Sequence, residues 1–120
     1  MKIAVTATGA TPESDVDPRF GRAKYFIIYD IDNGTWVSKD NTVNLNAVQG
    51  AGIQSAKNII DAEAQAVITG NVGPKAFMVL QKAAIPMYTG AKGTVRDAIA
   101  AFSGGSLNSV DRATVEGHWS

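Results

Sequence analysis

Three glycine-containing segments have the composition of loops that bind anions. Residues 69–73 and 89–93 share the pattern Thr-Gly-x-x-Gly, and the segment Gly-Ala-Gly at 50–52 opens a stretch with helical spacing. Glycine lets backbone N–H groups approach a ligand, and a helix N-terminus adds unpaired donors and about half a positive charge. These segments therefore favour an anion held by backbone donors. The alternative is that the glycines only end strands.

Basic residues accompany these segments although 11 acidic residues balance 11 basic ones. The stretch from Asn71 to Arg96 contains cations and no acid, and Arg19, Arg22 and Lys24 form a second basic group. A basic pocket is thus compatible with zero net charge, while the lack of an overall basic excess argues against a general nucleic-acid binder. Phe20, between Arg19 and Gly21, either covers a ligand or plugs its own loop.

Residue types needed for catalysis are scarce. The absence of cysteine excludes disulfides, thiolate nucleophiles and cysteine-ligated clusters. The one histidine, His118, stands near the end of a polar tail. Met78 and Met87 are expected in the core rather than on a soft metal. With few candidates for nucleophilic or acid–base work, we expect a binding protein and not an enzyme.

The order of expected elements predicts one α/β domain. Strands are expected at 1–7, 24–31, 35–39, 66–69 and 85–89, and helices at 50–64, 74–83 and 94–102. Asn33-Gly34 predicts a hairpin between the second and third strands, because both residues accept positive φ. The alternation that follows predicts parallel strands, hence a mixed sheet. The domain is expected to span 1–104, with a polar tail at 105–120.

This architecture also predicts where a ligand binds. In open α/β sheets, ligands bind beyond the carboxyl ends of the parallel strands, so the segments at 69–73 and 89–93 are expected at one edge. The apolar stretch Ile3–Ala7 is too short for a signal peptide, and no apolar run approaches the roughly 18 residues of a membrane span. We therefore expect a cytoplasmic protein that does not bind membranes.

Several motifs occur in the order found in a known family. They are Arg-Phe-Gly-Arg-Ala at 19–23, Gln-Gly-Ala-Gly at 49–52, Val-Ile-Thr-Gly-Asn-Val-Gly-Pro at 67–74 and Gly-Ala-Lys-Gly-Thr at 90–94. Residues 1–104 thus resemble the dinitrogenase iron–molybdenum cofactor biosynthesis family, the cluster carriers related to NifX. The resemblance implies a ribonuclease H-like three-layer domain with a five-stranded mixed sheet and helices on both faces. It also implies binding or delivery of a metal–sulfur cluster without catalysis, and a protein partner for delivery or signalling.

Two departures from that family affect the expected chemistry. Many relatives have histidine where Arg19 and Gln49 stand here, so both possible imidazole ligands are missing. Arginine and backbone N–H groups can still hold a preformed anionic cluster by charge and hydrogen bonds. This is similar to the branch that carries a molybdenum–copper sulfide cluster without covalent ligation; an Fe–Mo or Fe–S cluster precursor is the alternative.

The resulting hypothesis assigns binding roles to three groups of residues. Arg19 and Arg22 would clamp the cluster, Phe20 would cover it, and Lys92 would supply counter-charge. Backbone donors would come from the glycine-containing segments. The full expected set is Arg19, Phe20, Gly21, Arg22, Gly50, Ala51, Gly52, Gly70, Asn71, Gly73, Gly90, Lys92 and Gly93. The alternative function is a small regulatory or interaction module without a cluster, whose basic edge meets an acidic partner.

Overall fold

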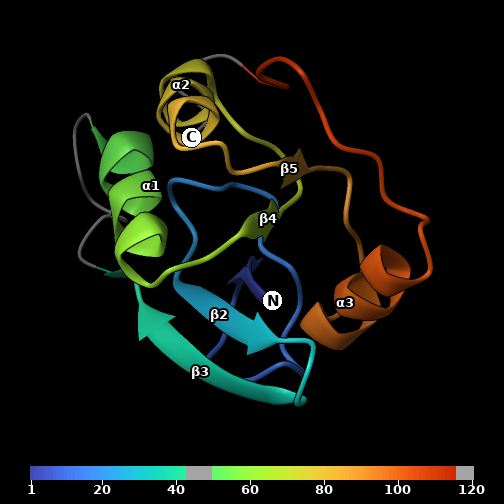
Figure 1. Ribbon diagram of the computed structural model, residues 1–120. Coiled ribbons are helices and arrows are strands. Elements are labelled where there is room, and N and C mark those ends of the chain that lie inside the picture. Colours follow the sequence, from blue (N-terminus) through green and yellow to red (C-terminus); the bar gives the residue numbers. More distant parts are fainter. Residues whose placement is uncertain (43–49, 116–120) are drawn as a thin grey trace.

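The computed structural model describes residues 1–42 and 50–115, which form a five-stranded sheet and three helices (Figure 1). The strands are β1 (Lys2–Ala7), β2 (Tyr25–Asp30), β3 (Thr35–Asp40), β4 (Ala66–Ile68) and β5 (Met87–Tyr88). The helices are α1 (Ala51–Asp61), α2 (Pro74–Lys82) and α3 (Val95–Ser103). Every expected element is present, with shifts of a few residues at the ends.

The sheet is mixed, as the element order predicts. Its strand order is β3-β2-β1-β4-β5. The pairs β1–β2 and β2–β3 are antiparallel, whereas β1–β4 and β4–β5 are parallel. The parallel half is short because β4 and β5 have only three and two residues. The mixed sheet is confirmed, and the finer ribonuclease H-like label stays a prediction from the family resemblance.

The hairpin between β2 and β3 is present, but its turn is wider than Asn-Gly alone predicts. Asp30 pairs with Thr35, so four residues connect the strands. Only Gly34 adopts positive φ, at 72°, and Asn33 does not. The Asn33 side chain instead accepts a hydrogen bond from the Thr35 amide at 3.1 Å. This local bond stabilises the longer turn.

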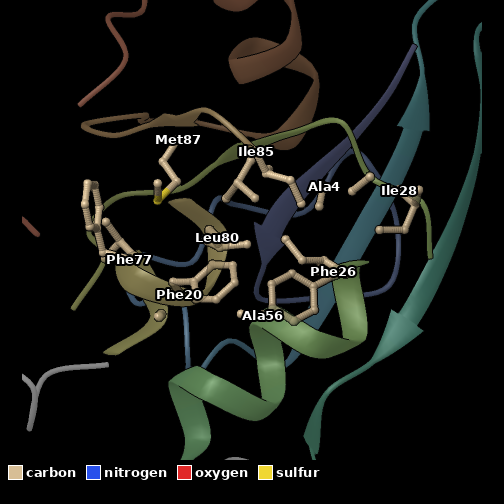
Figure 2. Packing of buried hydrophobic residues seen from close by; sticks show 14 residues of the cluster. Ala4, Phe20, Phe26, Ile28, Ala56, Phe77, Leu80, Ile85 and Met87 are labelled. Atoms are coloured by element: carbon tan, nitrogen blue, oxygen red, sulfur yellow. The ribbon is translucent and has the colours of Figure 1, made fainter. Parts of the chain in front are cut away.

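Alternate residues of the strands build two cores, one on each face of the sheet. Ala4, Phe26 and Ile28 point toward α1 and α2, where the cluster of Figure 2 forms. Ile3, Val5 and Ile27 point to the other face, which α3 covers with Val95, Ala98 and Ile99. Helices therefore lie on both faces, as the resemblance implies. No helix in the described ranges is long and apolar enough to cross a membrane.

The described part of the polar tail lies against the domain. The Val110 amide donates to the Met87 carbonyl at 2.9 Å, and Ser109 bridges to Tyr88 at the β5 edge of the sheet. Thr114 and Val72 form three hydrogen bonds, at 2.8, 2.9 and 3.3 Å. In Figure 1 this segment runs from α3 past β5. It thereby fixes the loop that precedes α2; His118 lies outside the described residues.

Candidate anion-binding site

The N-termini of the three helices share one edge of the sheet. β1, β4 and β5 are parallel and end there, and β3 ends there too, because it is antiparallel to β2. The loop after β1 folds over this edge. The Asp17 amide donates to the Thr6 carbonyl at 3.0 Å, and the Val16 amide donates to the Gly93 carbonyl at 2.9 Å. The long loop thus covers part of the region where a ligand is expected.

The α3 N-terminus is closed by this loop. The amides of Val95 and Arg96 donate to the carbonyls of Ser14 and Pro12, at 2.9 and 3.0 Å. Thr94 and Asp97 complete a capping box at the same helix end. These bonds use the donors that a bound anion would need.

The expectation that Gly90–Gly93 offers a helix N-terminus to a ligand is therefore wrong for α3. The Gly90 amide is also used, since it donates to the Gly70 carbonyl at 2.9 Å. Lys92 is exposed. Its side chain, unlike the helix amides, can still supply counter-charge at this edge.

The N-termini of α1 and α2 differ from that of α3. Their N-caps are Gly50 and Gly73, no described side chain caps either helix, and neither first turn holds an acid. The first turn of α2 instead holds Lys75, where a cation meets the positive end of the helix dipole. Such a placement typically costs about 0.3–1 kcal/mol, and a bound anion would offset it. These two helix ends are the ones suited to an anion.

The segment Arg19–Arg22 connects these two helix ends. On the α2 side, the Phe20 amide donates to the Asn71 carbonyl at 3.2 Å, and Arg19 bridges to Asn71. On the α1 side, the Ser55 hydroxyl donates to the Gly21 carbonyl at 3.1 Å. The two arginines of the predicted clamp are therefore held between α1 and α2. Arg19 is exposed and Arg22 half-buried.

Two of the predicted glycines have clear backbone reasons for being glycine. A Cβ at Gly70 would lie 2.6 Å from the Pro18 Cα, so the loop carrying Arg19 can approach β4 only over glycine. Gly50 has φ of 81°, which L side chains rarely adopt. Both glycines are thus required by the backbone of the site itself. Ala51 and Gly52 are buried in the first turn of α1.

Phe20 corrects the expectation of an aromatic cover. Its ring is fully buried and lies 5.3 Å from the Phe26 ring, measured between centroids. Figure 2 places it among Phe26, Leu80 and Ala56. Phe20 is therefore the hydrophobic plug of its loop, because an apolar ring gains more from the core than from solvent.

Two buried polar residues that were not predicted from the sequence hold the segment Arg19–Arg22 in place. Asn41 donates to the Ala23 carbonyl at 2.8 Å and to the Ser55 hydroxyl at 3.2 Å. Both Asn41 and Ser55 are almost fully buried. The sequence did indicate Ser55, because it is a polar residue on the otherwise apolar face of α1, and a buried hydroxyl needs a hydrogen-bond partner. Gln49 lies outside the described residues.

Asp17 is the buried carboxylate of the described chain, with 6% of its surface exposed. Burial raises the pKa of Asp17 above the ordinary 3.8, and a hydrogen bond from the Arg19 amide partly opposes this shift. Because the pKa is raised in the folded state, protonated Asp17 stabilises the fold. This stabilisation is complete at low pH and is lost as the pH rises through the folded-state pKa. Ionised Asp17 therefore destabilises the fold near neutral pH.

We expect Asp17→Asn to raise the free energy of unfolding near neutral pH, because the amide oxygen still accepts the Arg19 N–H bond without a buried charge. The gain should shrink as pH falls to the ordinary Asp pKa of 3.8. Urea unfolding across this pH range measures it. Asp15→Asn controls for loss of one negative charge from the same loop. A gain for Asp17→Asn that is constant with pH would contradict the assignment.

The described residues lack a cluster of side chains that could coordinate a metal ion directly. No group of three or more His, Cys, Asp or Glu residues that could hold a metal ion occurs in the described ranges. The chain also contains no cysteine. The site therefore offers arginine, lysine and backbone N–H groups, which bind anions rather than metal cations.

Comparison with known proteins identifies the family. Residues 1–105 match the model of the family described as dinitrogenase iron–molybdenum cofactor. The chain belongs to this family. The family match covers all five strands and all three helices of the described structure, together with the segment Arg19–Arg22.

Solved and curated relatives agree with this family assignment. The apo form of the orange protein from Desulfovibrio gigas is 37% identical, with a TM-score of 0.92 and coverage of 95% of this chain and 96% of that one. A NifB-like protein from Thermotoga is 35% identical, with a TM-score of 0.84 and coverage of 97% and 98%. An uncharacterised Methanocaldococcus jannaschii protein is 32% identical over 109 residues, 89% of each chain.

Proposed function

We propose that this chain carries an anionic metal–sulfide cluster, held without covalent bonds at the edge where α1 and α2 begin. The observation that carries the proposal is the position of Arg19–Arg22 between two helix N-termini that no described side chain caps. Helix N-termini and arginine together favour a polyanion. The cluster is cargo, and the protein is proposed to be a carrier rather than an enzyme.

The available groups fit a cluster that brings its own sulfide. Without cysteine, the chain supplies no thiolate to replace a cluster ligand. Backbone N–H groups and the arginine guanidinium groups can donate hydrogen bonds to sulfides at the cluster surface. Lys75 in the first turn of α2 and Lys92 in the loop before α3 are both exposed and would add positive charge near the cluster. Recognition would therefore depend on charge and hydrogen bonding.

Membership of this family and the similarity to the orange protein support a metal–sulfide cluster as the cargo. The resemblance to the family branch that carries a molybdenum–copper sulfide cluster favours molybdenum and copper as its metals. An Fe–Mo or Fe–S precursor is the second choice. A partner that receives the cluster is part of the proposal, since a carrier must release its cargo.

Loading of the metal-free protein tests the proposal. Under anaerobic conditions, the chain is mixed with tetrathiomolybdate and a copper salt and then desalted. We expect molybdenum and copper to coelute with the protein, together with a visible sulfide-to-metal charge-transfer band. Iron is measured in the same fractions. Colourless, metal-free protein would contradict the molybdenum–copper form, and failure with iron-containing precursors too would favour an interaction module without a cluster.

A further inference from the structure

An apolar surface rimmed by lysines lies where α1 meets α2, and it meets the proposed cluster site only at Lys75. Lys75, Met78, Val79 and Lys82 are spaced by three, four and seven residues, so they form one stripe along α2. With Ile53 of α1 they line a shallow cavity of about 280 Å³. The stripe thus has apolar residues in the middle and a lysine at each end.

Met78 is the exposed centre of this surface. The sequence-based expectation placed it in the core, but 55% of its surface is exposed. The reason is helical geometry: α2 buries Ala76, Phe77 and Leu80 against the sheet, and Met78 points away from that face. A large, flexible thioether side chain in this position is typical of surfaces that bind other proteins.

The charges around the cavity all have the same sign. α2 contains no acid, and Lys57 follows Ile53 by one turn on the same stripe of α1. None of Lys57, Lys75 and Lys82 forms an ion pair with the described residues. An occupant of this surface would therefore combine an apolar anchor with flanking carboxylates.

We propose that this surface docks an acidic amphipathic helix of a partner protein. Such a helix would place an aliphatic or aromatic side chain in the cavity against Met78 and Ile53, and acidic residues beside the lysines, one turn away on either side. The proposal does not depend on a bound cluster. If the cluster proposal holds, the Lys75 end of the stripe would bring this partner to the α2 N-terminus beside the cargo.

Two other occupants fit less well. Among the described helices of this chain, α2 has no acid, and α1 and α3 carry single acids at Asp61 and Asp97, so a second copy offers no acidic helix face. A membrane surface requires a broad apolar face that inserts between lipids. Here the apolar area is one cavity centred on Met78.

A designed peptide tests the proposal on the metal-free chain. The probe is a fluorescein-labelled helical peptide with leucines at i, i+4 and i+7 and glutamates between them; a scrambled peptide of equal composition is its control. We expect saturable fluorescence anisotropy, at least about tenfold tighter than with the scrambled peptide. Amide NMR shifts should concentrate at Ile53, Met78 and Val79.

Variants connect the binding to this surface. Met78→Ser and Lys82→Glu should each weaken peptide binding by about tenfold or more, since they remove the anchor contact and reverse a flanking charge. Lys39→Glu, the same charge change on β3, should leave it unchanged. Cluster loading of Lys82→Glu should also be unchanged, because Lys82 ends α2, away from its N-terminus. Docking and loading therefore fail independently.

Several results would overturn the proposal. They are no saturable binding, equal binding of the scrambled peptide, or equal loss in Lys39→Glu. Dimerisation in analytical ultracentrifugation that Met78→Ser abolishes would assign the surface to a second copy. Sedimentation with phosphatidylserine vesicles that requires Met78, without peptide binding, would assign it to a membrane.

Discussion

Arg22→Glu is expected to abolish retention of a molybdenum–copper sulfide cluster through desalting, while the variant stays folded. The reversal replaces a hydrogen-bond donor and positive charge with a carboxylate, which repels a polyanion held between the N-termini of α1 and α2. Each 1.4 kcal/mol lost lowers affinity tenfold, and reversing a charge beside a polyanion should cost more than that. Bound molybdenum per chain and the charge-transfer band are the measurements.

Lys2→Glu is the matched control for this experiment. It makes the same change in charge at the opposite edge of the sheet, where β1 begins, and loses only an exposed ion pair with Glu63 at 3.9 Å. Its cluster loading should equal that of the unmodified chain. Circular dichroism and thermal unfolding must show that Arg22→Glu is folded. Normal loading of folded Arg22→Glu would remove Arg22 from the proposed site.

Phe20→Ala is expected to destabilise the fold by about 3–5 kcal/mol, the usual cost of removing a buried aromatic ring. Phe20 is fully buried and packs against Phe26, so the substitution leaves a cavity beneath the loop that carries the arginines. Domains of this size are typically stable by about 5–15 kcal/mol. Urea unfolding should therefore show that Phe20→Ala has lost a large part of its stability.

Phe20→Leu separates the role of plug from that of ligand cover. Leucine keeps most of the buried apolar volume, so this variant should be destabilised less than Phe20→Ala and should load the cluster normally at low temperature. A cover that touches the cluster through its aromatic ring would behave differently. A stable Phe20→Leu that fails to load would show that the ring contacts the cargo.

Local sequence patterns determined most of the architecture. Residues such as Phe26, Ile27 and Ile28 favour a strand because β-branched and aromatic side chains pack well on a pleated surface. Helical spacing of Ile53, Ala56 and Ile59 likewise predicts α1, and strand–helix alternation predicts the parallel half of the sheet. These predictions succeed because periodicity and turn residues act over short distances along the chain.

Part of the candidate site could also be inferred from local residues. The glycines at 50–52 and 70–73 and the arginines at 19 and 22 are visible in the sequence, and topology brings loops after parallel strands to one edge. The structure holds Arg19–Arg22 between the starts of α1 and α2. A resemblance to the dinitrogenase iron–molybdenum cofactor family was likewise visible in the order of the motifs.

Only the tertiary structure decided which helix ends stay open and which side chains are buried. The loops before α2 and α3 share the pattern Thr-Gly-x-x-Gly, yet the carbonyls of Pro12 and Ser14 close the N-terminus of α3. Phe20 looks like a ligand cover and is a core residue, whereas Met78 looks like a core residue and is exposed. The physical reason is shared. A backbone N–H group binds the acceptor that the fold places beside it, and an apolar side chain is buried only where other elements pack against it. In both cases the partners lie far away in the sequence.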